Sequence, residues 1–151
     1  MGKVIKKLGG PRIQAINLAV DEKTDLRGLI IVAVDTMLAR KKIFEICKFN
    51  WGVDYLIEAR MGGHLGKIFA VDPKNPEAIN RYGKYFFNDK DAAIPICATN
   101  ETIPSLWMVA ASIVHLALLY KKVPVLKHTF IEGTINLIDQ PIVNFDTYDL
   151  I

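Results

Sequence analysis

Asp35 is the residue whose neighbours in the sequence most favour a ligand-binding or catalytic role. It follows the unbroken apolar run at 29–34, and the residues after it carry apolar side chains at helical spacing. In α/β proteins, ligands bind beyond the carboxyl ends of strands. A carboxylate there can hold a Mg²⁺ ion that bridges phosphate oxygens. Asp35 could instead be a helix N-cap that accepts hydrogen bonds from backbone N–H groups, and spacing alone favours the cap.

Arg40 and Cys97 are two further candidates for a reactive site. Arg40 stands five residues after Asp35, where it could neutralise a phosphate, pair with Asp35, or be a solvated helix charge. Cys97 lies in a polar stretch just before a long apolar segment. A helix N-terminus there would lower the pKa of the thiol and make it nucleophilic, although a lone cysteine is often a small buried apolar residue. We interpret Cys47 as a core residue.

The glycines in "RMGGHLGK", at 60–67, do not form a G-x-G-x-x-G phosphate loop. The sequence that follows them, "KIFAV", has the pattern of a strand, whereas a phosphate cradle needs a helix behind it. We therefore expect a hairpin turn with close backbone approach. The three histidines and two cysteines show no metal-ligand spacing, so no zinc motif is expected.

The elements that would position these residues alternate between strands and helices. The early strands should be parallel and the later ones, joined by short turns, antiparallel. This order predicts an α/β fold, a three-layer mixed sheet with helices packed on it, in a single domain over 1–151. The strands are expected at about 12–20, 29–34, 53–60 and 66–72, with a strand or two at 127–139. The helices are expected at about 36–48 and 102–120, and 75–87 should be a short helix followed by an extended piece.

Composition narrows the partners and the compartment. The net charge is +3 and the sequence has no run of basic residues, so we do not expect a nucleic acid partner. The first residues lack a signal-peptide pattern and the cysteines are few, so a cytoplasmic location is expected. The apolar segment at 103–120 approaches the length of a membrane span but contains Pro104, Ser112 and His115. We expect a buried central helix there and no membrane partner.

Three segments taken in order resemble the ThiF/MoeB-like family, the ATP-dependent activators of ubiquitin-like and sulfur-carrier proteins. They are "VDTMLARKKIFEIC", "IEARMGGHLGKIFAVD" and "ICATNETIPSLWMVAASIVHLAL". The resemblance covers roughly 12–122 and corresponds to the second, C-terminal half of that family's adenylation domain. It implies a Rossmann-like fold.

The resemblance also implies roles for individual residues. Asp35 would hold Mg²⁺ and promote adenylation of a carrier protein's C-terminal carboxylate, and Arg40 would match the arginine of the same motif, on the nucleotide. Thr36 stands where asparagine is common in the family. Cys97 would match a cysteine that receives sulfur or an acyl group in some members and has no catalytic role in others. ATP and Mg²⁺ are the implied cofactors.

The family's glycine-rich nucleotide loop precedes the matched region and has no counterpart in this sequence. Two hypotheses follow. The chain is an adenylyltransferase part that needs a separate, complementary glycine-rich subunit to act on a ubiquitin-like or sulfur-carrier protein. Alternatively, it is a catalytically inactive scaffold or protein-binding module that forms a homodimer or larger oligomer through its apolar surface.

Overall fold

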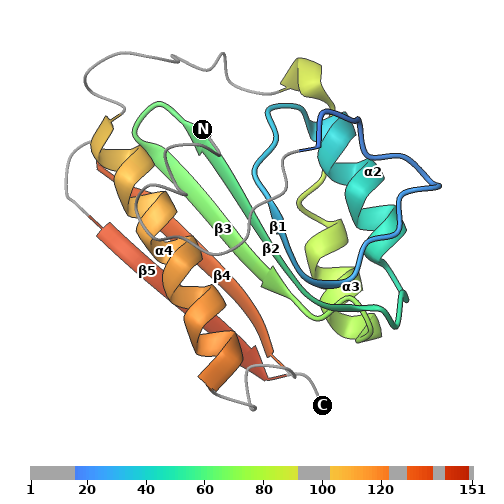
Figure 1. Ribbon diagram of the computed structural model, residues 1–151. Coiled ribbons are helices and arrows are strands. Elements are labelled where there is room, and N and C mark those ends of the chain that lie inside the picture. Colours follow the sequence, from blue (N-terminus) through green and yellow to red (C-terminus); the bar gives the residue numbers. More distant parts are fainter. Residues whose placement is uncertain (1–15, 92–102, 123–128, 138–141, 150–151) are drawn as a thin grey trace, which may run out of the picture.

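A computed structural model describes residues 16–91, 103–122, 129–137 and 142–149. Their centre is a five-stranded mixed sheet in the order β1-β2-β3-β4-β5 (Figure 1). The pair β1–β2 is parallel and the other three pairs are antiparallel. The parallel first pair and the antiparallel hairpin β2–β3 agree with the sequence prediction, whereas the sequence did not predict β5. The strands are β1 (Gly28–Val32), β2 (Val53–Gly62), β3 (Leu65–Val71), β4 (Thr129–Asn136) and β5 (Ile142–Asp149).

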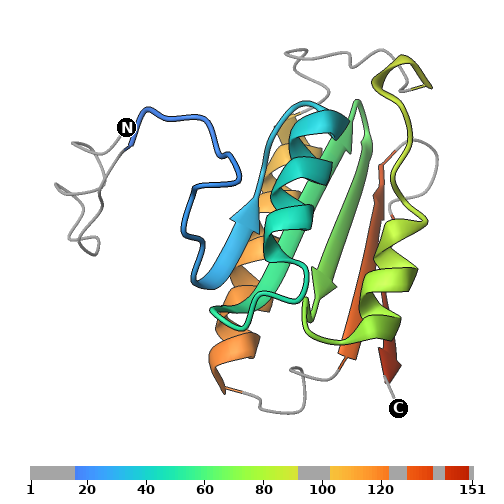
Figure 2. The ribbon, with the colours of Figure 1, turned by 90° about the vertical axis from the view of Figure 1, so that its right-hand side faces the viewer.

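Helices cover both faces of this sheet, so the described part of the chain has three layers (Figure 2). On one face lie α2 (Met37–Cys47) and α3 (Pro76–Gly83), with the short 3-10 helix η1 (Asp89–Asp91) beyond them. On the other face lies α4 (Ile103–Lys122), packed on β2, β3 and β4. Along β2, β3 and β4, successive buried side chains alternate between two apolar cores, one on each face of the sheet.

The parallel pair β1–β2 is joined by α2, whose ends follow local signals. Thr36 is its N-cap, and the Thr36 hydroxyl accepts a hydrogen bond from Ala39 N at 3.2 Å. The helix ends at Cys47, and Phe49 turns the chain with a positive φ of 58°. The predicted helix at 36–48 is therefore confirmed, and the cap is Thr36 rather than Asp35.

The glycine-rich stretch at 60–67 forms the predicted hairpin. Gly62 pairs with Leu65, so only Gly63 and His64 make the turn, and Gly63 has a φ of 60°. Gly66 provides the close approach, because a Cβ atom there would lie 2.7 Å from Val109 Cγ2 of α4. The stretch is thus a structural turn that brings β3 close to α4.

Three sequence predictions differ from the structure. Residues 16–20 are not a strand, and the rest of the predicted strand, 12–15, lies outside the described residues. β1 is not covered on both faces, because only Val32 is buried and Ile31 is 50% exposed.

The third difference concerns α4, which is not a buried central helix. It spans the predicted residues, but only Ser105, Val109 and Leu116 are buried. Its outer side exposes large apolar side chains, which we call the α4 stripe: Ile103, Leu106, Trp107, Val114 and Leu118. Among the described helices it alone is long and apolar enough to cross a membrane, with a mean hydropathy of 1.7. The sequence does not indicate which side of α4 the sheet covers, because the helix is apolar on nearly every side.

Candidate functional site

The carboxyl end of β1 and the start of α2 form a corner that presents Asp35. The Asp35 residue is exposed. No hydrogen bond or ion pair joins its carboxylate to another described residue, because the capping role falls to Thr36. The Asp35 carboxylate is therefore available to a ligand at the end of a parallel strand, the position at which α/β sheets bind ligands.

A second carboxylate, that of Asp89, occupies the N-terminus of α2. Asp89 Oδ1 accepts a hydrogen bond from Met37 N at 2.5 Å, and Asp89 Oδ2 accepts one from Leu38 N at 3.3 Å. These are two of the N–H groups that a helix leaves without internal partners. Asp89 thereby fixes η1 beside the corner, and it comes eight positions before Cys97 in the sequence.

Arg40 is buried beneath this corner and links its backbone to β2 through hydrogen bonds. It is 7% exposed, so it is not a solvated helix charge, and it does not pair with Asp35. Its Nη2 donates to the carbonyl oxygen of Val34, the residue before Asp35. Its Nη1 donates to Glu58 Oε1 and, at 2.6 Å, to the carbonyl oxygen of Ala59. Arg40 thus ties the end of β1 to β2.

Glu58 is the centre of a buried ionic cluster, which we call the Glu58 cluster: Arg40, Glu58, Arg60 and Tyr82. The Glu58 side chain is fully buried. Arg60 Nε lies 2.9 and 2.8 Å from its two carboxylate oxygens, and the Tyr82 hydroxyl donates to Oε2 at 2.8 Å. Burial, followed by the charge of Glu58, raises the pKa of Tyr82, so its hydroxyl remains a proton donor.

Arg60, the second arginine of the Glu58 cluster, connects β2 to the chain after α3. Arg60 Nη1 donates to the Tyr85 carbonyl oxygen at 2.6 Å, and its guanidinium carbon lies 4.9 Å from the centre of the Phe69 ring. One carboxylate therefore faces two guanidinium groups, and aromatic rings contact the excess positive charge. The arrangement holds β1, β2, α2 and α3 in fixed relation around the corner.

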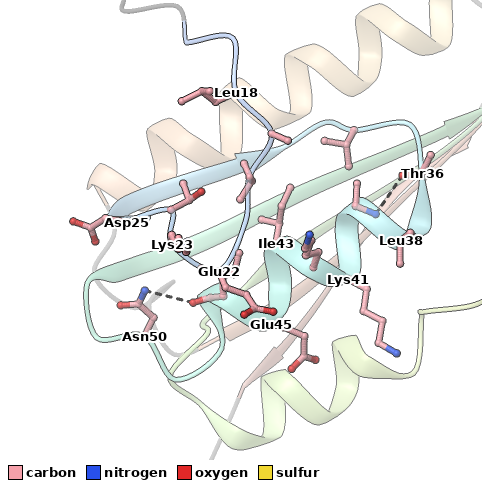
Figure 3. A pocket seen from close by; sticks show the side chains of 17 residues that line it. Leu18, Glu22, Lys23, Asp25, Thr36, Leu38, Lys41, Ile43, Glu45 and Asn50 are labelled. Atoms are coloured by element: carbon pink, nitrogen blue, oxygen red, sulfur yellow. Dashed lines mark hydrogen bonds between the residues drawn. The ribbon is translucent and has the colours of Figure 1, made fainter.

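A large open cavity of about 1240 Å³ lies beside the corner, and Thr36 is on its border. It separates α2 from the chain segment at 18–25, as Figure 3 shows. Its lining is mostly apolar, from Leu18 and Val20 on one side to Leu38 and Ile43 on the other. Asp35 is not among the lining residues, so the candidate site is the corner and the cavity adjoins it.

The two cysteines differ in what the structure says of them. Cys97 lies outside the described residues, so its predicted role as a nucleophile stays a prediction. Cys47 is fully buried, as expected of a core residue, and burial raises the pKa of its thiol to about 11. Among the described residues, no group of three His, Cys, Asp or Glu side chains forms a metal cage. A Mg²⁺ ion held by one carboxylate and by substrate phosphates needs no such cage.

Sequence reasoning did not identify Glu58, Arg60, Tyr82 or Asp89. A signal existed for the first two, because Glu58 and Arg60 are charged residues at i and i+2 directly after the apolar run at 55–57 of the strand "VDYLIEAR". Two such charges on one face of a buried strand indicate a partner in the core. The contact of Asp89 with α2 spans 52 positions and left no local signal.

Comparisons of the chain with protein-family models, with curated proteins and with solved structures found no match.

Proposed function

We propose that this chain is the Asp35-bearing part of a ThiF-like adenylyltransferase with a Rossmann-like fold. The reaction would be ATP-dependent activation of the C-terminus of a ubiquitin-like or sulfur-carrier protein. A glycine-rich nucleotide-binding half would come from outside residues 1–151. The observation that carries the proposal is the exposed Asp35 carboxylate at the carboxyl end of a parallel strand, without a described partner.

Asp35 and Arg40 would have different roles in this reaction. The carrier's terminal carboxylate attacks the α-phosphorus of ATP, a bond forms between its oxygen and that phosphorus, and pyrophosphate leaves. Asp35 would hold a Mg²⁺ ion, which supplies charge neutralisation on the phosphates. Arg40 would act as a positioning residue, because its donors are engaged by Val34 O, Glu58 and Ala59 O and it holds the backbone before Asp35.

The edge of the sheet supports the need for a complementary half. Within the described residues, β1 has a neighbour on one side only. Its sequence, "GLIIV", has no charge, and Ile31 on the α4 face is half exposed. Parallel strands are normally covered on both faces, and an edge strand presents unpaired N–H and C=O groups that can pair with another chain. A parallel strand from a glycine-rich half would satisfy this edge and would place a nucleotide beside Asp35.

The direct test is ATP–pyrophosphate exchange with a candidate carrier protein and a glycine-rich partner polypeptide. Asp35→Ala should abolish exchange while leaving the thermal midpoint unchanged, because the side chain is exposed and makes no described contact. Asp146→Ala, which removes an exposed carboxylate from β5, is the matched control and should leave the rate unchanged. An unchanged rate in Asp35→Ala would refute the assignment.

The α4 stripe favours a second candidate, an inactive scaffold that oligomerises through its apolar surface. Trp107 is 71% exposed and Val114 is 57% exposed, and contiguous apolar surface of this kind marks interaction sites. Native mass spectrometry with and without Mg-ATP separates the candidates. A stable homodimer that gains no nucleotide, and that Trp107→Glu converts to a monomer, would favour the scaffold. Bound nucleotide, or co-purification with a nucleotide-binding chain, would favour the enzyme.

A further inference from the structure

A small hollow lies on the face of the sheet that carries α3, far from the Asp35 corner. Its volume is about 340 Å³, within the range of small-molecule sites. We call it the Tyr148 hollow. Its lining residues are Arg81, Lys84, Tyr85, Phe130 and Tyr148. Phe130 is on β4, which β2 and β3 separate from β1, whereas Asp35 follows β1. The hollow therefore lies across the sheet from the Asp35 corner.

Three aromatic rings form the apolar part of the hollow. Phe130 is 1% exposed, and its ring centre lies 5.9 Å from that of Tyr148 and 6.4 Å from that of Tyr85. These separations are typical of stacked and tilted aromatic pairs. A planar ring that entered the hollow would contact the partly exposed rings of Tyr85 and Tyr148, which the buried Phe130 ring holds in place.

The Tyr85 ring is also fixed. It packs on Phe69 at 4.6 Å, and its hydroxyl donates to Glu132, whose other oxygen accepts from Lys67. The hydrogen bond to Glu132 raises the pKa of Tyr85 to about 12. The phenol therefore stays neutral near pH 7 and presents a ring rather than a negative charge to a ligand.

Positive groups with available donors border these rings. Arg81 Nε and Nη2 are held by Glu77 Oε1 at 3.1 and 3.0 Å, and the guanidinium carbon lies 4.7 Å from the centre of the Tyr148 ring. Among the described residues, Arg81 Nη1, the Lys84 amine and the Tyr148 hydroxyl have no hydrogen-bond partner. Three donors thus remain around an apolar floor.

The net charge of the side chains around the hollow favours a ligand with a negative charge. Glu77 offsets Arg81 and Lys67 offsets Glu132, so the charge of Lys84 remains. A cationic ligand is disfavoured, because Arg81 already lies against the Tyr148 ring. We propose that the Tyr148 hollow binds a small aromatic carboxylate, with its ring against Tyr85 and Tyr148 and its carboxylate at Arg81 and Lys84.

The first experiment titrates the purified full chain with 2-naphthoate and, separately, with the neutral 2-naphthamide, followed by ligand-observed NMR. The two probes share one ring system and differ in charge. We expect naphthoate to bind about tenfold more tightly, the usual effect of a charge-assisted hydrogen bond. Equal affinity for both probes, or no naphthoate binding at about 1 mM, would overturn the proposal.

Two variants of one ion pair then locate the binding. Arg81→Gln should weaken naphthoate binding about tenfold, whereas Glu77→Gln, which disrupts the same pair but keeps the guanidinium, should not weaken it. Lys48→Gln, which removes a cation from the C-cap of α2, is the remote control. Equal binding by Arg81→Gln and the wild-type chain would refute this site. Because Arg81 and Glu77 are both partly exposed, neither substitution threatens the fold.

Discussion

Glu58→Gln is the substitution that tests the structural account of the Asp35 corner most severely. The change keeps the size of the side chain and an oxygen acceptor for Tyr82, but it removes the only negative charge of the Glu58 cluster. Arg40 and Arg60 would remain, with side chains 8% and 14% exposed, facing a neutral amide. Neither guanidinium can lose its proton, so the charge imbalance has no chemical relief.

The expected loss of stability follows from this burial. Removing one partner of a buried ion pair costs about 3–5 kcal/mol, because the remaining charge is left without compensation. A domain of ordinary stability has about 5–15 kcal/mol in total. We therefore expect Glu58→Gln to lose a large part of the free energy of unfolding, through the charge rather than through a cavity.

Urea unfolding followed by circular dichroism measures this loss directly. Glu77→Gln supplies the control, because it neutralises an arginine partner in a pair whose side chains are 39% and 42% exposed. Exposed helix pairs contribute about 0.3–0.5 kcal/mol, so the control should change the urea midpoint little. The slope of the transition should be the same in all three proteins if the native state stays compact.

A loss below about 1 kcal/mol in Glu58→Gln would refute the reasoning, because such values are typical of exposed pairs. It would mean that water or another anion reaches the two arginines. The proposed positioning role of Arg40 would fail with it, since that role depends on a rigid connection between Glu58 and the end of β1.

The remaining predictions concern α2, the hairpin and the core thiol. Asp89→Ala should lower the free energy of unfolding by about 0.5–2 kcal/mol, because two N–H groups of α2 lose their acceptor, and Asp89→Asn should recover part of it. Gly66→Ala should cost about 1–3 kcal/mol in urea titrations, because the new Cβ would lie 2.7 Å from Val109 Cγ2. Gly62→Ala, where a Cβ meets nothing within 4 Å, should be close to neutral. Burial raises the pKa of Cys47 from 9.0 to about 11, so the folded state keeps a proton that the unfolded chain releases. The free energy of unfolding should therefore fall as the pH rises through that interval, and unfolding midpoints of Cys47→Ala should show a shallower decline.

Local signals in the sequence predicted most of the elements. The change from the apolar run of β1 to the helical spacing of α2 located both elements, and Thr36 supplied the cap. The glycines at 60–67 predicted the hairpin because a two-residue turn needs a positive φ, which Gly63 provides. Such features depend on neighbours within a few positions, so they can be predicted from sequence.

The interactions that support the corner could not be predicted in the same way. Glu58 meets Arg40 across 18 positions and Tyr82 across 24, and only the fold brings them together. The exposure of the α4 stripe was also missed, because a helix with apolar residues on nearly all sides does not indicate which of them the sheet covers. Asp35 does lie between a strand and a helix, as the local pattern predicted, and its role in a site stays a prediction.

β1 is at the edge of the described sheet, and this position affects the tendency of the chain to aggregate during and after synthesis. Natural sheets protect their edges from aggregation with lysine, proline or a bulge. The strand Gly28–Val32 contains neither lysine nor proline, and its one register irregularity is at its first residue, between Gly28 and Leu29. Within the described residues, this edge is a template on which a second extended chain can grow. Growth of that kind is a bimolecular process, so its rate increases with the concentration of unpaired chains. Early capture by a strand-donating partner, or a low rate of synthesis, would therefore keep the chain out of aggregates.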